Sequence, residues 1–189
     1  MGETDWPVSI RGVTESIVTT LGPNERYNVA ALGLHASGDG PVTARTWGRT
    51  RTWRNFCERG EGVVQFTRDP VVFVDAALDI REHDEPVLEA ADAWVTVAVE
   101  QRDEGTDNGT QWVDWELTPG EAKVVRRVVP TYSRGYGAVV EATVAASRLD
   151  VEGYDTERLR QRIEYFGAVV ERCGGPRERE AFERVELQI

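Results

Sequence analysis

One segment of the chain concentrates basic and hydroxyl side chains. Residues 45–55 read RTWGRTRTWRN, with four arginines, three threonines and no acid. The segment runs from the predicted end of a strand, through Gly48, to the predicted start of a helix. Such a junction offers free backbone N–H groups and the positive end of a helix dipole, and arginine adds paired hydrogen bonds to phosphate oxygens. We therefore predict a phosphate site here; the alternative is that the arginines pair with surface acids and the threonines cap the helix.

A second segment, residues 27–33, has the sequence YNVAALG. Asn28 enters an otherwise apolar strand and is followed by the small residues Ala30 and Ala31. Small side chains let a flat ligand approach the backbone, and an asparagine amide can bond to ring carbonyls or imines. Ordinary tight packing is the alternative interpretation. Trp47 and Trp53 could stack on such a ring, although tryptophan more often packs in a core or an interface.

Several common catalytic patterns are missing from the sequence. There is no G-x-G-x-x-G between a strand and a helix, no P-loop and no G-x-S-x-G. Cys57, Cys173, His35 and His83 are scattered, which argues against a disulfide framework and against a metal site. Carboxylates are too frequent for any pair of them to be informative. No catalytic residue and no metal is predicted.

Charge is the most unusual feature of the composition. The 189 residues carry a net charge of −11, and Lys123 is the only lysine, so every other basic residue is arginine. This predicts an acidic surface of the kind that keeps halophilic proteins soluble, although a merely acidic protein fits as well. Nucleic acid is disfavoured as a partner.

The sequence also bears on localisation. Residues 1–6 form an acidic segment that lacks the features of a signal peptide, and no apolar run reaches the length of a membrane helix. We therefore expect a cytoplasmic protein that binds no membrane.

The pattern of the first two thirds of the chain predicts an antiparallel sheet. Six segments have strand character: residues 15–20, 27–35, 42–47, 62–67, 93–101 and 110–117. Tight turns separate the early strands, and Asp107-Asn108-Gly109 is a strong hairpin signal. About six strands are enough for a small closed barrel. Residues 50–59 and, less clearly, 71–78 favour helices, and residues 82–89 read as an acidic loop.

The character of the sequence changes after Pro130. Apolar residues recur at helical spacing over residues 135–149 and 156–173, and Pro176 opens a third helix to about Val185. The fold class predicted from the residues is thus α+β, a mainly antiparallel barrel followed by a helical unit.

The order of four segments, 15–20, 27–33, 45–55 and 69–73, resembles an uncharacterised, mainly archaeal family of the FMN-binding (flavin mononucleotide) split-barrel superfamily. Residues 133–142 and 174–178 look like the appended helical region of that family. The likeness extends from about Glu15 to Val185. It implies a six-stranded antiparallel split β-barrel over residues 14–128, a C-terminal helical subdomain over residues 131–189, and a homodimer with FMN near the subunit interface.

The resemblance also implies site residues and a function. Six residues match positions expected to contact the cofactor: Arg45, Thr50 and Thr52 at the phosphate, Asn28 and Ala30 beside the isoalloxazine, and Asn55 on the helix facing it. Ser133 stands where Asn is expected before Arg-Gly. The implied function is FMN binding, in a flavin-dependent oxidoreductase with an unidentified small-molecule redox partner. A non-catalytic flavin-binding or sensing module is the alternative, and a cofactor-free interaction protein is a third possibility.

Overall fold

A computed structural model of the chain describes residues 5–36, 40–107 and 109–189. Its contacts divide the chain into two compact units. The first extends to Thr67 and continues over Arg81–Arg127, and the second combines Arg68–Ile80 with Val128–Ile189. Residues 68–80 fall inside the barrel range predicted from the sequence, 14–128, whereas their contacts group them with the helical unit. The second unit is therefore discontinuous in sequence.

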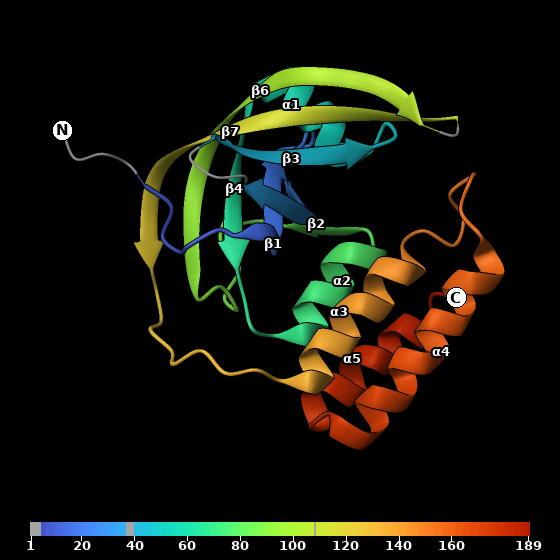
Figure 1. Cartoon of the computed structure of the whole chain (residues 1–189). Helices are drawn as coiled ribbons and strands as arrows, with labels where there is room; N and C mark the ends of the chain where they lie inside the picture. Colours follow the sequence, from blue (N-terminus) through green and yellow to red (C-terminus); the bar gives the residue numbers. More distant parts are fainter. Residues whose placement is uncertain (1–4, 37–39, 108) are drawn as a thin grey trace. The chain divides into compact units, whose positions relative to one another are not determined.

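Seven strands and one helix make up the described part of the first unit (Figure 1). In chain order they are β1 (Gly12–Leu21), β2 (Tyr27–Ala36), β3 (Val42–Trp47), α1 (Arg51–Arg59), β4 (Glu61–Phe66), β5 (Arg81–His83), β6 (Ala93–Asp107) and β7 (Thr110–Val124). The antiparallel strand order is β1-β4-β6-β7-β3-β2, and the pairing of β1 with β2 closes the ring, with β5 as an extra strand on β2. The predicted six-stranded antiparallel barrel is confirmed.

Strand β5 and the long β6–β7 hairpin differ from the sequence-based expectation. Residues 82–89 were predicted as a loop, but Arg81–His83 pair with Tyr27–Val29 of β2. A strand of three residues has no local signature, because its pairing partner lies far away in the sequence. The hairpin also extends beyond both predicted strands, and Asn108 of its predicted turn lies outside the described residues.

One edge of β2 is shared by two strands. Strand β3 pairs with Leu34 and His35, whereas β5 pairs with Tyr27–Val29. Among the described residues, 30–33 of β2 have no strand partner on this edge. This edge of β2 is therefore split between two strands, with residues 30–33 lying between the two pairings.

Alternate residues of the strands point into the barrel and build its core. The buried cluster consists of Val18, Leu32, Leu34, Val42, Ala44, Phe56, Val64, Val95, Val97, Val99, Val113, Trp115 and Leu117. Phe56 comes from α1 and meets Trp115 edge to face, with the ring centroids 5.3 Å apart. Helix α1 starts at its N-cap Thr50 and ends at Gly60, whose φ of 65° suits glycine. Packing of Phe56 thus fixes α1 against the barrel.

The second unit is a cluster of helices: α2 (Pro70–Leu78), α3 (Arg134–Ala146), α4 (Thr156–Cys173) and α5 (Pro176–Glu186). The three predicted C-terminal helices are confirmed, and residues 71–78 are helical, as favoured. Buried apolar residues from all four helices share one core, including Val71, Val139, Ile163 and Val185. None of the described helices combines the length and hydropathy needed to span a membrane.

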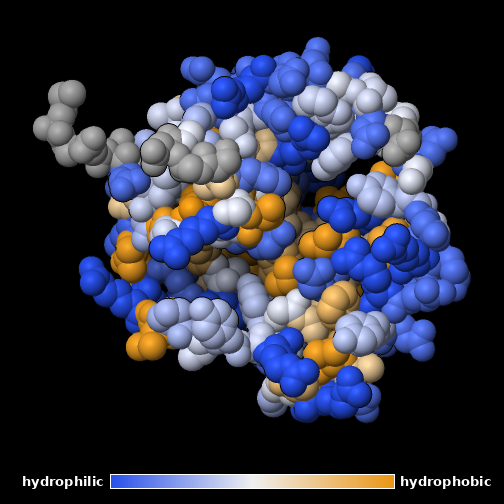
Figure 2. Space-filling model, viewed as in Figure 1, coloured by the Kyte–Doolittle hydropathy of each residue, from blue (hydrophilic) through white to orange (hydrophobic). Residues whose placement is uncertain are grey.

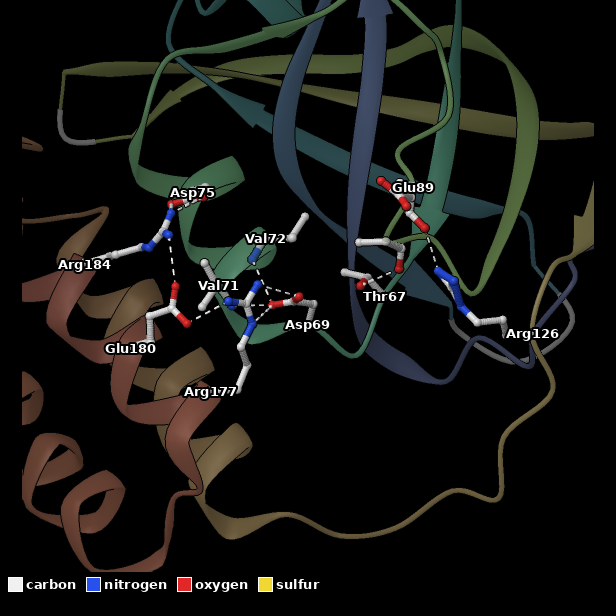
Figure 3. A network of polar contacts seen from close by, with 11 residues as sticks. Thr67, Asp69, Val71, Val72, Asp75, Glu89, Arg126, Arg177, Glu180 and Arg184 are labelled. Atoms are coloured by element: carbon white, nitrogen blue, oxygen red, sulfur yellow. Dashed lines mark hydrogen bonds and ion pairs between the residues drawn. The ribbon is translucent and has the colours of Figure 1, made fainter.

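Ion pairs join α5 to α2 within the second unit (Figure 3). Arg177 donates to both carboxylate oxygens of Asp69, the N-cap of α2, at 3.0 and 2.7 Å. Arg184 donates to Asp75 at 2.6 Å, and Glu180 accepts from both arginines.

Hydrophilic residues cover much of the molecular face in Figure 2, with hydrophobic ones visible between them, as expected for so charged a chain.

Candidate functional site

The first turn of α1 presents unpaired donors. The Thr50 hydroxyl oxygen accepts from the Trp53 amide at 3.2 Å, and the Thr50 carbonyl accepts from the Arg54 amide at 3.0 Å. The amides of Arg51 and Thr52 occupy the first two helical positions, where no intrahelical acceptor exists. The first turn contains no acidic residue. This helix start therefore combines free N–H groups with the positive end of the dipole, an arrangement that suits an anion.

Four buried polar side chains lie where α1 meets β1 and β2. The Asn28 amide donates to the Thr52 hydroxyl at 3.2 Å, and the Asn55 amide donates to the Thr20 hydroxyl at 3.0 Å. Thr20 and Asn28 are opposite one another in the β1–β2 register. The structure therefore brings Asn28, Thr52 and Asn55 together and adds Thr20. Asn28 Oδ1 accepts no hydrogen bond from the described residues, and the Thr52 hydroxyl proton is also unused.

Ala30 lies two residues after Asn28, on the same face of β2. It is half-buried against the barrel core, and it belongs to the stretch that has no strand partner on the split edge. The Ala30 side chain is a single methyl group, so it projects little from the strand beside Asn28. This position is compatible with the approach of a flat ring.

Arg45 has a different set of partners, on β7. It lies on the face of β3 opposite to the buried Ala44, and it donates from Nε and Nη2 to the two oxygens of Asp114, both at 2.7 Å. Asp114 is its register partner on β7, and the guanidinium also lies 4.0 Å from the centroid of the Trp112 ring. The hydrogen bond from Arg45 holds the pKa of Asp114 below its usual range. Among the described residues, no hydrogen bond or ion pair joins Arg45 to Thr50 or Thr52.

The other arginines of the basic segment differ in their partners. Arg51 pairs at 2.8 Å with Glu82 of β5, which is opposite Asn28 in the β2–β5 register. Arg49 donates to Gln111 at 3.3 Å. Arg54 donates to Asn55 Oδ1 at 3.4 Å, and its buried Nε has no hydrogen-bond partner in the part of the chain that the structure describes. Neither Arg54 nor Glu82 is among the site residues predicted from the sequence; for Arg54 the available signal was its place in the basic segment beside Asn55.

A closed antiparallel barrel with a split edge and a helix start at that edge defines a split-barrel protein. Two family models match the chain: the N-terminal domain of the DUF447 proteins of unknown function over residues 14–126, and a second DUF447 model over residues 133–186. The chain belongs to the DUF447 family. The sequence-based resemblance to an uncharacterised split-barrel family is thereby confirmed.

Solved structures of other proteins resemble this chain to different degrees. An FMN-bound DUF447 protein of Methanosarcina mazei matches with a TM-score of 0.80 at 25% identity, over 95% of this chain and 96% of that one. The flavin reductase of a Pseudomonas putida styrene monooxygenase matches at 10% identity over 60% of this chain and 80% of that one, with a TM-score of 0.44. An FMN-binding protein of Thermus thermophilus matches at 13% identity over 66% and 80%, also with a TM-score of 0.44.

Proposed function

We propose that this chain binds FMN, with the phosphate at the start of α1 and the isoalloxazine along the split edge of β2. The observation that carries the proposal is the match, over nearly the whole of both chains, to a member of the same family that was solved with FMN. The local geometry supports it independently, because the start of α1 offers unpaired donors beside the split edge of β2.

The residues present fit the two ends of FMN. The amides of Arg51 and Thr52 and the hydroxyl groups of Thr50 and Thr52 would hold the phosphate. Arg45, also predicted at the phosphate, would have to exchange at least one of its bonds to Asp114. For the ring, Asn28 has an unused carbonyl oxygen that can accept from a ring N–H, Ala30 is small, and Asn55 lies nearby on α1. The Asn28 amide donates to the Thr52 hydroxyl at 3.2 Å, so the groups proposed for the ring adjoin those proposed for the phosphate.

We further propose that the protein is a flavin-dependent oxidoreductase with a small-molecule partner. Bound FMN supplies the redox chemistry, while the protein binds and orients it. The side chains assigned beside the ring, those of Asn28, Ala30 and Asn55, are two neutral amides and a methyl group, none of which titrates near neutral pH. That feature favours the second candidate, a flavin-binding or sensing module. Hydride transfer to FMN needs no such group, so redox turnover distinguishes the two functions.

The test is a titration followed by reduction. Purified apoprotein is titrated with FMN and with riboflavin, and binding is followed by quenching of flavin fluorescence. We expect FMN to bind and riboflavin to bind more weakly, and absence of FMN binding would contradict the proposal. The complex is then mixed anaerobically with NADH, NADPH or a reduced deazaflavin. Bleaching of the flavin followed by reoxidation with an acceptor supports the oxidoreductase, whereas FMN binding without reduction by any donor supports the binding module.

A further inference from the structure

The arginines between residues 45 and 59 fall into two groups. Three of them contact carboxylates: Arg45 with Asp114, Arg51 with Glu82, and Arg59 with Glu25. Within the described part of the chain, Arg49 and Arg54 have no carboxylate partner. Arg49 is exposed, so water can solvate its guanidinium. Arg54 is half-buried, and this makes it the exception.

The guanidinium of Arg54 is incompletely bonded. Its Nε is shielded from solvent and has no hydrogen-bond partner among the described residues; the one side-chain bond found within them, from Nη2 to Asn55 Oδ1, is long at 3.4 Å. Buried donors are nearly always satisfied in folded proteins, because an unpaired one retains the full cost of its desolvation. Acids are abundant in this chain, with 33 Asp and Glu residues against 22 Lys and Arg. A half-buried arginine that has no carboxylate partner among the described residues indicates that a ligand supplies its acceptor.

We infer that Arg54 supplies the guanidinium that binds the phosphate of FMN, an inference that rests on the proposed function. Arg54 lies four residues, about 6 Å along the helix axis, after Thr50. Side chains of a helix lean toward its N-terminus, so a long side chain at Arg54 can cover the first turn, where the free amides lie. A phosphate dianion satisfies a buried cation better than a neutral ring carbonyl does. Arg45 and Arg51 already have carboxylate partners.

The test compares Arg54→Gln with Arg49→Gln, which removes the same charge from an exposed position of the same segment. Affinities for FMN and riboflavin are measured by fluorescence quenching. We expect Arg54→Gln to weaken FMN binding about 10- to 100-fold, the range for loss of hydrogen bonds to a charged group, and to leave riboflavin binding nearly unchanged. Arg49→Gln should change neither affinity substantially. Arg54→Lys, which keeps the charge but loses the planar fork, should fall between wild type and Arg54→Gln.

Three results would overturn the inference. Equal weakening of FMN and riboflavin by Arg54→Gln would assign Arg54 a purely structural role. An unchanged preference of Arg54→Gln for FMN over riboflavin would place the phosphate elsewhere, while the proposed function would stand. A wild type that binds neither flavin would contradict the proposed function itself. Far-ultraviolet circular dichroism checks the folding of each variant, and Arg54→Lys provides the comparison if Arg54→Gln does not fold.

Discussion

Arg45 and Asp114 illustrate, at the scale of single residues, how two anions can compete for one guanidinium. Both bonds from Arg45 to Asp114 measure 2.7 Å, and stacking on Trp112 further orients the arginine. Because the pKa of Asp114 is lowered by Arg45, the pair persists until the pH falls below the ordinary carboxyl range. A phosphate that uses Arg45 must therefore displace a carboxylate that stays ionised at neutral pH.

This competition leads to a prediction for Asp114→Asn. If Arg45 binds the phosphate, the variant should bind FMN several-fold more tightly, since a neutral amide competes less well for the guanidinium. Riboflavin affinity should not change, and parallel fluorescence titrations measure both. Glu116→Gln is the matched control, because it removes one negative charge from the same strand without touching Arg45; its partner is Arg102. Unchanged or weaker FMN binding by Asp114→Asn would mean that Arg45 serves the fold of β3 and β7.

The residue types in the sequence indicated part of the candidate site, but they did not show which side chains contact one another in the folded protein. Asn28 was noticed as a polar residue in an apolar strand, and it does contact Thr52. The role of Thr20 depends on its register opposite Asn28, and that of Glu82 on a three-residue strand. Neither pairing has a local signal. As ligands of FMN, the six residues named from the sequence stay predictions.

At the scale of elements, helix α2 was predictable from its local sequence, but its packing partners were not. Asp69 followed by Pro70 is a helix-start signal, and Asp69 accepts from the amides of Val71 and Val72 as an N-cap should. The helix was therefore predictable. Its place was not, because Val71 and Val74 pack in the core of the helical unit, more than fifty residues away in sequence from most of their neighbours.

The same helix start predicts a pH dependence. Burial alone would raise the pKa of Asp69, but hydrogen bonds from Arg177 and from the amides of Val72 and Val71 outweigh it and leave the pKa lowered. A lowered folded-state pKa gives stability that is present above the unfolded carboxyl value of about 3.9 and is lost as the pH falls through the folded-state pKa.

Asp69→Asn tests this dependence, since asparagine still caps a helix but does not titrate. Near neutral pH the variant should be less stable than wild type by about 1 kcal/mol, the upper range for a partly exposed ion pair. The difference should shrink as the pH falls below about 4. Urea unfolding followed by circular dichroism measures it. Glu183→Gln, at an exposed position of α5, is the control; a gap between Asp69→Asn and wild type that does not vary with pH would contradict the prediction.

At the scale of the whole molecule, net charge opposes the association of two copies of the chain, whereas exposed apolar surface favours it. The chain carries −11, so two copies repel one another. The barrel unit nevertheless exposes large apolar side chains at strand ends, among them Val13 at 59%, Trp47 at 37% and Val124 at 44%. Burial of such side chains favours association, and it does not weaken with added salt, whereas charge repulsion does.

We therefore predict a homodimer with two-fold symmetry, stabilised by salt. Most soluble homo-oligomers are two-fold dimers, in which the same surface of both copies meets. Light scattering coupled to gel filtration should give twice the chain mass of 21.1 kDa at high salt. The dimer fraction should decrease as the salt is lowered, because repulsion then extends further; the screening length grows from about 3 Å at 1 M to about 30 Å at 0.01 M. A dilution series at each salt concentration separates a reversible dimer from aggregation. A monomer at high salt would rule out the dimer, and dissociation on raising the salt would show that charge pairs, not apolar burial, hold the copies together.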